Sequence, residues 1–168
     1  MMKTVVQLSK LAEEMKLKNL TPEISMDEVE ITSQEINRPA LQLAGYYEHF
    51  SHERVQIIGY VEYTYLMQKE EDERSVCFER FISSGIPCVI FTTLTEPTED
   101  MLCICKKYSV PALVTTRTTS AFMAEIIRWL HYAAFHATVV SFLSVGLGLV
   151  FPDEIVFWIS NIKGKCVT

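Results

Sequence analysis

The sequence has few cysteines, and none of them stands at the spacing of a metal site or a redox pair. The five cysteines are odd in number and include no C-x-x-C pattern, so neither a zinc ribbon nor a disulfide framework is expected. His49 and His52 lie three residues apart, but no third ligand has a recognisable spacing, so no metal site is predicted. We expect buried, free thiols, because unpaired cysteine behaves as a small hydrophobic side chain.

An excess of basic charge and a long unbroken apolar run are also missing. The chain of 168 residues has 15 Lys and Arg against 21 Asp and Glu, a formal net charge of -6, which argues against a nucleic-acid binder that relies on a broad basic surface. The longest apolar zone, residues 133–162, is interrupted by serines, Pro152, Asp153 and Glu154. A membrane-spanning helix needs about 20 apolar residues, and residues 1–18 lack the apolar core of a secretory signal. We therefore expect a cytoplasmic protein without a membrane span.

What the sequence does contain is an alternation of amphipathic and continuously apolar segments. Helical periodicity predicts helices over residues 5–17, 70–85, 96–109 and 117–135, and β-branched or continuous apolar runs predict strands over 54–66, 86–93 and 110–116. Apolar runs between amphipathic helices are what a parallel sheet covered on both faces requires. The predicted fold class is therefore α/β, with a small, mostly parallel sheet flanked by helices.

Threonine pairs end two of the predicted strands. Thr92 and Thr93 close one strand, and Thr115 and Thr116 close the next. They would lie at the carboxyl edge of the sheet, where open α/β sheets usually bind ligands, and could line an anion crevice with Arg117 as a partner. Alternatively, their hydroxyl groups cap the helices that follow by accepting bonds from free N–H groups. We favour the capping interpretation.

A dense polar and aromatic loop precedes the predicted strand 54–66. It supplies candidates for acid/base chemistry but no nucleophile in a recognisable setting, so catalysis within this segment is not predicted. We expect its charged groups to hold the loop together and its aromatic groups to pack it onto the sheet or a partner. The polar candidates are Asn37, Arg38, Glu48, His49, His52, Glu53 and Arg54, and the aromatic ones are Tyr46, Tyr47 and Phe50.

The same region resembles a known family. Residues 36–66, INRPALQLAGYYEHFSHERVQIIGYVEYTYL, are similar to the signature of the N-terminal domain of bacterial HPr kinase/phosphorylase, roughly D-I-x-R-P-G-L-x-L-A-G-Y-F-x-x-F-x-x-x-R-[IV]-Q-[IL]-[IL]-G-x-x-E-x-[ST]-[FY]-L. The similarity continues through residues 86–113 and 115–130, and so covers most of residues 4–131. This sequence departs from the pattern at Glu35, where the family often has Asp, and at Ala40, where it often has Gly.

The resemblance implies one part of a two-part enzyme. In the family this domain precedes a P-loop kinase domain, which uses ATP or pyrophosphate, with Mg²⁺, to phosphorylate a serine of HPr, the phosphocarrier of the sugar phosphotransferase system. The same enzyme removes the phosphate by phosphorolysis and acts in carbon catabolite control. Members are typically homo-hexamers. The N-terminal domain is similar to a domain of the muramyl peptide ligases, and no catalytic role is implied for it.

The end of the chain resembles an altered start of that kinase domain. A P-loop needs G-x-x-x-x-G-K-[ST], because its backbone N–H groups and lysine hold the phosphates. Gly164, Lys165 and Cys166 match the end of such a loop and are the candidate cofactor-binding residues, but Ile159 stands where the first glycine belongs. We expect an HPr kinase/phosphorylase N-terminal-like domain over 1–132 and an incomplete start of the kinase domain over 133–168. By itself the chain should bind ATP and Mg²⁺ poorly and should have neither activity, and HPr would bind through the kinase domain.

Two other functions are compatible with the sequence. One is a stand-alone α/β regulatory module that binds a nucleotide or metabolite, indicated by the pattern x-E-P-x-E-x-M-L followed by V-P-x-L-x-T within residues 95–115. The other is a partner module of an oligomer, because the aromatic loop and the apolar residues beyond Phe135 would form an apolar patch that drives association. A ligand that binds the folded module would raise its melting temperature.

Overall fold

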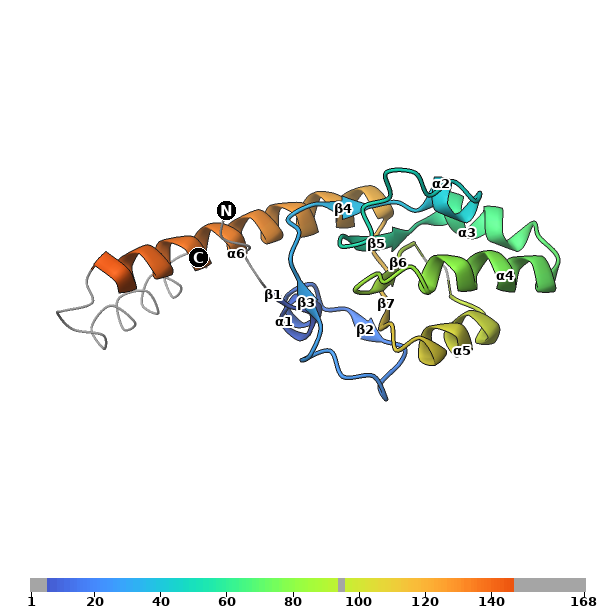
Figure 1. The fold of residues 1–168 in the computed structure, drawn as a ribbon, viewed down its shortest axis with the longest axis horizontal. Helices are drawn as coiled ribbons and strands as arrows, with labels where there is room; N and C mark the ends of the chain where they lie inside the picture. The colour runs from blue at the N-terminus through green and yellow to red at the C-terminus, as the bar shows by residue number, and fades with distance from the viewer. Residues whose placement is uncertain (1–5, 94–95, 147–168) are drawn as a thin grey trace. The chain divides into compact units, whose positions relative to one another are not determined.

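The computed structural model describes residues 6–93 and 96–146, with the backbone alone for residues 137, 138 and 140–146 (Figure 1). The chain divides into two compact units, Met1–Ala134 and Phe135–Thr168, and the fold described below is that of the first. Most of the predicted second domain, residues 133–168, lies outside the described residues, so the predicted division at residue 132 stays a prediction.

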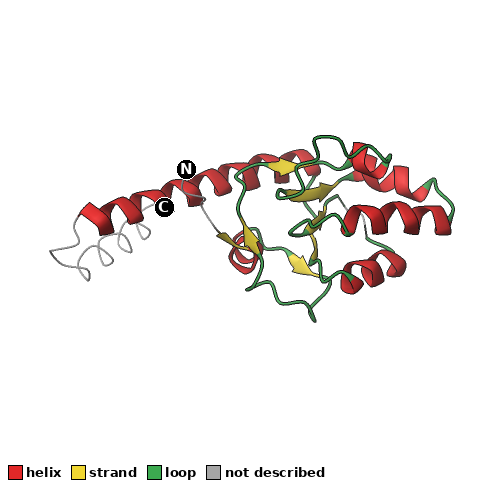
Figure 2. Ribbon diagram, in the orientation of Figure 1, coloured by secondary structure: helices red, strands yellow, loops and turns green. Residues whose placement is uncertain are grey.

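Short strands and helices alternate along most of the described chain (Figure 2). The helices predicted at 70–85, 96–109 and 117–135 and the strands predicted at 86–93 and 110–116 are all confirmed, although the last helix continues to Gly146. In chain order the elements are β1 Val6–Gln7, α1 Leu8–Glu14, β2 Lys18–Asn19, β3 Glu30–Ile31, β4 Ile36–Asn37, α2 Ala40–Leu43, β5 Val55–Ile58, α3 Tyr60–Met67, α4 Glu71–Ile82, β6 Val89–Phe91, α5 Glu99–Lys107, β7 Ala112–Val114 and α6 Thr119–Gly146.

A five-stranded sheet with the order β2-β7-β6-β5-β4 forms the centre of the unit. The four strands from β4 to β7 are mutually parallel, with Ile57 opposite Ile90 and Ile90 opposite Leu113. Only β2 runs antiparallel, against β7, and β1 pairs with β3 in a separate two-stranded ribbon. The predicted fold class, α/β with a mostly parallel sheet flanked by helices, is confirmed.

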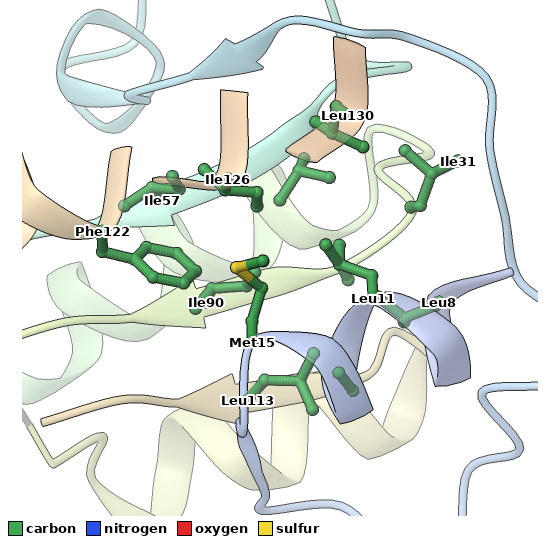
Figure 3. Packing of buried hydrophobic residues seen from close by; sticks show 13 residues of the cluster. Leu8, Leu11, Met15, Ile31, Ile57, Ile90, Leu113, Phe122, Ile126 and Leu130 are labelled. Carbon is green, nitrogen blue, oxygen red and sulfur yellow. The ribbon is translucent and has the colours of Figure 1, made fainter. Parts of the chain in front are cut away.

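Successive strand residues enter two different cores, which explains why the strands read as continuous apolar runs. Side chains alternate between the two faces of a strand, so Ile57 packs in one cluster and Ile58 in the other. Figure 3 shows the first cluster, in which side chains of α1 and α6 meet Ile57, Ile90 and Leu113. The second cluster lies between the sheet and α3, α4 and α5. Each fully buried Leu, Ile or Phe contributes roughly 1.5–3 kcal/mol.

The strand predicted over 54–66 is wrong after Ile58, because β5 ends there and α3 begins at Tyr60. The aromatic and β-branched composition of this stretch favoured a strand. In the structure, the buried residues of α3 are Glu62 and Leu66, which are spaced four residues apart as on one helix face. At the N-terminus the helix begins only at Leu8, because Val6 pairs with Ile31 in the ribbon.

Candidate functional site at the carboxyl edge of the sheet

The carboxyl edge of the parallel strands brings together polar groups that are far apart in the sequence. Arg38 follows β4 closely, Gly59 follows β5, Thr92 follows β6 and Thr115 follows β7. Because parallel strands end at one edge, the segments that follow them are neighbours. The prediction that the threonine pairs lie at the ends of neighbouring strands is confirmed by the pairing of β6 with β7.

Three threonine hydroxyl groups form a chain of hydrogen bonds at this edge. Thr119 Oγ1 lies 2.7 Å from Thr92 Oγ1 and 3.1 Å from Thr93 Oγ1, and the Thr92 hydroxyl donates to the Ile58 carbonyl at 3.4 Å. One arrangement uses every hydroxyl proton: Thr93 donates to Thr119, Thr119 to Thr92, and Thr92 to the carbonyl. An anion, or any other ligand that accepts hydrogen bonds from these hydroxyl groups, would have to break bonds within the chain of threonines.

Thr93 caps the helix that leads away from this edge. The first helical N–H group of α6, that of Thr119, donates to Thr93 Oγ1 at 3.1 Å, and the Thr93 N–H donates to the Arg117 carbonyl at 3.0 Å. Thr93 adopts a left-handed φ of 59°, which is uncommon for a β-branched residue and costs about 1–2 kcal/mol. The two hydrogen bonds hold the residue in this conformation. Thr93 therefore caps a helix, but this helix is α6, which follows β7, and not α5, the helix that follows Thr93 itself and that the capping interpretation predicted.

Thr115 and Arg117 also use their polar groups locally. The Arg117 N–H donates to Thr115 Oγ1 at 3.3 Å, which makes a tight turn before α6. The Arg117 guanidinium, in the turn before α6, pairs with Glu125 of that helix. The alternative prediction, in which Arg117 is the partner of a bound anion, is therefore disfavoured, because Glu125 already pairs with its charge. Thr116 is exposed and has no hydrogen bond in the described part of the chain.

Glu62 is the residue at this edge that the sequence analysis missed. Its carboxylate is 2% exposed, accepts a bond from the Gly59 N–H at 3.0 Å, and pairs with the Arg38 guanidinium at 2.7 Å. The spacing of Gly59 and Glu62, an N-cap residue followed three positions later by Glu, is a capping-box signal that could have revealed the helix start. Glu62 thus ties β4, β5 and α3 together.

The polar and aromatic loop is held by its own contacts, as predicted. The Tyr47 ring meets Phe50 edge to face, and Phe50 packs on Phe81 of α4. The Arg80 guanidinium lies 4.5 Å from the centre of the Tyr47 ring, and Arg54 pairs with Glu35. Arg54, Arg38, Tyr47 and Phe50 therefore serve the architecture. The predicted packing is wrong for Tyr46, which is 49% exposed and donates a hydrogen bond to the exposed Glu48.

The remaining loop candidates do not gather into one site. Asn37 donates to the Gln56 side chain at 2.8 Å, whereas His49 and Glu48 are exposed and 3.7 Å apart. His52 and Glu53 lie at the opposite edge, beside an open cavity of about 500 Å³. In the described part of the chain, no three His, Cys, Asp or Glu side chains gather where they could hold a metal ion.

The described cysteines are free, but only two of the four are buried. Cys88 and Cys105 lie within the core, and burial raises the pKa of each thiol to about 12. The prediction of burial is wrong for Cys103, which is exposed, and for Cys77, which is half-buried. Cys103 lies on the outer face of α5, whereas Cys77 of α4 packs against the margin of the second cluster. Gly164, Lys165 and Cys166, the candidate cofactor-binding residues, lie outside the described residues.

Comparisons with known proteins agree on the larger part of the chain. Residues 6–130 match the family described as HPr Serine kinase N terminus. The HPr kinase/phosphorylase of Lachnoclostridium phytofermentans is 44% identical over 125 residues, 74% of this chain and 40% of the relative. That of Caldicellulosiruptor bescii is 41% identical over 123 residues, 73% of this chain and 40% of the relative. The chain thus spans about two fifths of the length of these relatives.

A solved structure shares the fold at low sequence identity. It is the crystal structure of the CBS and DRTGG domains of the regulatory region of Clostridium perfringens pyrophosphatase complexed with diadenosine tetraphosphate, with a TM-score of 0.50 and 14% identity over 72% of this chain and 46% of that one. This likeness concerns the fold alone. Within the ranges described for this chain, no helix has both the length and the apolar character that a membrane crossing requires.

Proposed function

Since this chain belongs to the family of HPr serine kinase N-terminal domains, we propose that it is the N-terminal part of a bifunctional HPr kinase/phosphorylase. The observation that carries the proposal is the family match over residues 6–130. The whole protein would phosphorylate a serine of HPr with ATP and Mg²⁺, remove that phosphate by phosphorolysis, and act in carbon catabolite control. It would be a cytoplasmic homo-oligomer that binds HPr through its kinase domain.

Within such an enzyme, residues 6–134 would have an architectural role. The polar groups that a catalytic site would need at the carboxyl edge are engaged in internal bonds: Glu62 with Arg38 and Gly59, and Thr93 with Thr119. Arg117 is paired with Glu125. These contacts fix the strand-to-helix junctions, so the edge supports a rigid module better than a reaction centre.

We further propose that this chain alone catalyses neither phosphorylation nor phosphorolysis. Phosphoryl transfer depends on a positioned phosphate, a metal ion and a residue that orients the attacking oxygen. Only Gly164, Lys165 and Cys166 match part of a phosphate loop, and the first glycine of that loop is replaced by Ile159. The sequence therefore departs from the glycine pattern that lets backbone N–H groups cradle a phosphate.

A labelled-phosphate assay tests this proposal. The full chain is incubated with purified HPr, Mg²⁺ and γ-labelled ATP, and in parallel with phosphorylated HPr and inorganic phosphate. The enzyme of Lachnoclostridium phytofermentans serves as the positive control, and a cooperative thermal transition shows that the chain is folded. We expect no transfer above the enzyme-free blank, and label that enters HPr or leaves it in step with the amount of chain would refute the proposal.

The alternative, a regulatory module that binds a nucleotide or metabolite, has less support. The hydroxyl protons at the carboxyl edge are already used in hydrogen bonds between the threonines. A ligand that accepts hydrogen bonds there would replace these bonds instead of pairing with free donors. Thermal shift with a panel of nucleotides, ATP and diadenosine tetraphosphate among them, separates the two functions. A saturable rise in melting temperature would favour the regulatory module, and an unchanged one would favour the architectural domain.

A further inference from the structure

An open cavity lies at the amino edge of the parallel strands, opposite the edge that holds Glu62 and the threonines. Its walls are the segment around β3 and the connections that lead into β5, β6 and β7, all of which belong to the first unit. The cavity has a volume of about 500 Å³, which lies within the roughly 300–1,000 Å³ of small-molecule sites. It is therefore large enough for a small organic molecule.

The floor of the cavity is apolar. Ile82, Ile86 and Val110 line it and are 1%, 5% and 6% exposed, because they belong to the second cluster. Tyr108 forms a wall whose position is fixed, since its hydroxyl group donates to the Glu79 carboxylate at 2.9 Å. An aliphatic chain can pack against this floor and gain from the burial of its methylene groups.

Two helix ends make the cavity electronegative. α4 and α5 both end there, and the residues that follow the two helices line it. A helix C-terminus carries a partial charge of roughly -0.5, which favours a nearby cation. Lys106 and Lys107, in the last turn of α5, could offset this charge, but they pair with Glu23 and Glu79. The electronegative helix ends thus remain available to a bound cation.

Three exposed carboxylates add to this charge. Glu28 and Glu30 come from the segment around β3, and Glu53 comes from the loop before β5. Glu28 and Glu30 have no ion pair within the described ranges, and Glu53 has only a distant one, 3.9 Å from Arg54 Nε. None of the described residues that line the cavity is Lys or Arg. A ligand of this cavity must therefore be positively charged.

The arrangement of these charges selects an elongated cation. Among the residues that the structure describes, no three His, Cys, Asp or Glu side chains gather closely enough to hold a metal ion. A phosphorylated ligand is excluded because its charge has the same sign as the carboxylates. Negative groups around an apolar floor fit a chain of methylene groups with ammonium groups along it, each of which donates several hydrogen bonds.

We propose that the cavity binds a linear aliphatic polyamine. One ammonium group pairs with Glu28 and Glu30, another pairs with Glu53 and the helix ends, and the methylene chain covers Ile86 and Val110. This site is separate from the proposed part in HPr phosphorylation, and neither depends on the other.

Isothermal titration calorimetry of the full chain with spermidine, in about 50 mM salt to limit screening, tests the proposal. We expect saturable binding of one spermidine per chain. Glu28→Gln/Glu30→Gln/Glu53→Gln should weaken it by about tenfold or more, because three attractive charges are lost together. Butylamine has a comparable chain but a single ammonium group, so it should bind far more weakly than spermidine.

A matched control separates this site from the general attraction of a polycation to an acidic protein. Glu13→Gln/Glu71→Gln/Asp72→Asn removes the same three negative charges at exposed positions outside the cavity, and it should leave the affinity unchanged. A cooperative thermal transition shows that each variant is folded. In the unaltered chain, the amide NMR signals of Gly85 and Ser109 should shift with spermidine, whereas that of Asp72 should not.

Three results would each overturn the proposal. The first is a dissociation constant weaker than about 1 mM for spermidine. The second is an equal loss of affinity in the two triple variants, which would show attraction to the net charge of -6 alone. The third is amide shifts that follow spermidine elsewhere in the chain but not at Gly85 and Ser109.

Discussion

Glu62 carries the most consequential single contact at the carboxyl edge. It is a buried carboxylate with two hydrogen-bonded partners, one of which, the Gly59 N–H, is also buried. Arg38 is 38% exposed and can be solvated if its partner is lost, whereas the N–H group cannot. The stability that Glu62 provides therefore comes mainly from satisfying the buried donor.

Replacing Glu62 separates these two contributions. We expect Glu62→Ala to lower the free energy of unfolding by about 2 kcal/mol, because the Gly59 N–H loses its acceptor. Glu62→Gln keeps an amide oxygen for that N–H and should cost clearly less. Urea denaturation measures both, with Glu71→Ala as the exposed acidic control. Equal losses for the alanine and glutamine variants would show that the ion pair, not the cap, matters.

Tyr47 offers the opposite case, a buried polar atom with no partner. Its hydroxyl group is inaccessible and makes no hydrogen bond, and burial raises the pKa of the phenol. We expect Tyr47→Phe to be neutral or slightly stabilising, by up to about 1 kcal/mol, because an unsatisfied group is removed and the ring contacts remain. The matched control is Tyr63→Phe, which loses a bond of 2.9 Å to the Glu96 carbonyl. A marked loss of stability in Tyr47→Phe, measured by thermal denaturation, would reveal a partner for the hydroxyl.

For single residues, the sequence predicted the kind of role that a side chain has better than it predicted the residue to which that side chain bonds. The residue type predicts that threonines at strand ends accept backbone N–H bonds, and Thr93 and Thr115 do so. The partners differ from the prediction, because Thr93 caps α6 instead of α5 and Thr115 closes the turn before α6. Glu62, Thr119 and the pairing of Arg117 with Glu125 were not foreseen. Such contacts depend on which strands are neighbours, and a single sequence does not specify the strand order.

Among the elements, the junction of β5 with α3 is the most tightly fitted. A Cβ atom on Gly59 would lie 2.6 Å from Thr119 Oγ1, closer than Cβ atoms approach in folded proteins, and 3.0 Å from Thr119 Cγ2, a tight contact. The glycine therefore lets the start of α6 come against the start of α3. This close approach, not a special backbone angle, is the reason for a glycine here, because its φ of -98° is open to other residues.

A double-mutant cycle tests this fit. Gly59→Ala should destabilise the protein by about 1–3 kcal/mol through overpacking. Thr119→Ala should also destabilise it, because the hydroxyl group that bonds to Thr92 and Thr93 is lost, although the backbone N–H at 119 still donates to Thr93. Combined, the two changes should cost less than their sum, since the smaller side chain at 119 makes room for the new methyl group. Additive losses would mean that the two residues do not touch.

The elements themselves could be predicted where one signal dominated. Segments with clear helical periodicity and charged ends, such as α4 and α5, were located from the sequence. The stretch that became β5 and α3 was misread, because Tyr60 and Val61 suit a strand by composition and are exposed on the helix. The end of the strand depends on Gly59 and on the buried carboxylate that caps the helix, and neither is visible in composition.

For the whole molecule, the buried thiols predict how stability falls in alkali. The pKa of Cys88 and of Cys105 rises from 9.0 to about 12 through burial, so the unfolded chain releases these protons first. The contribution of the two protonated thiols to the free energy of unfolding is complete below pH 9 and is lost as the pH rises towards 12. The free energy of unfolding falls by about 1.4 kcal/mol per thiol for each pH unit in this range. Urea denaturation from pH 8 to about pH 11 measures the slope.

Substitution isolates the thiols from the lysines that titrate in the same range. Cys88→Ala and Cys105→Ala lower stability at every pH by removing buried volume, but each should also make the alkaline slope shallower than in the parent. Cys103→Ala, which removes an exposed thiol, should leave the slope unchanged. An unaltered slope in both core variants would mean that alkaline unfolding begins elsewhere, for example at the ion pairs of Lys106 and Lys107.

The central claim is that residues 6–130 are a specific HPr kinase/phosphorylase N-terminal domain and not merely a module of the same fold. The most direct test is a chimera in which they replace the matching part of the Lachnoclostridium phytofermentans enzyme, to which they are 44% identical. The control chimera carries the segment of the pyrophosphatase regulatory region that shares the fold at 14% identity. The account predicts that the first chimera unfolds in a single transition and retains both activities near the parent level, whereas the control does not. A first chimera no better than the control would contradict it.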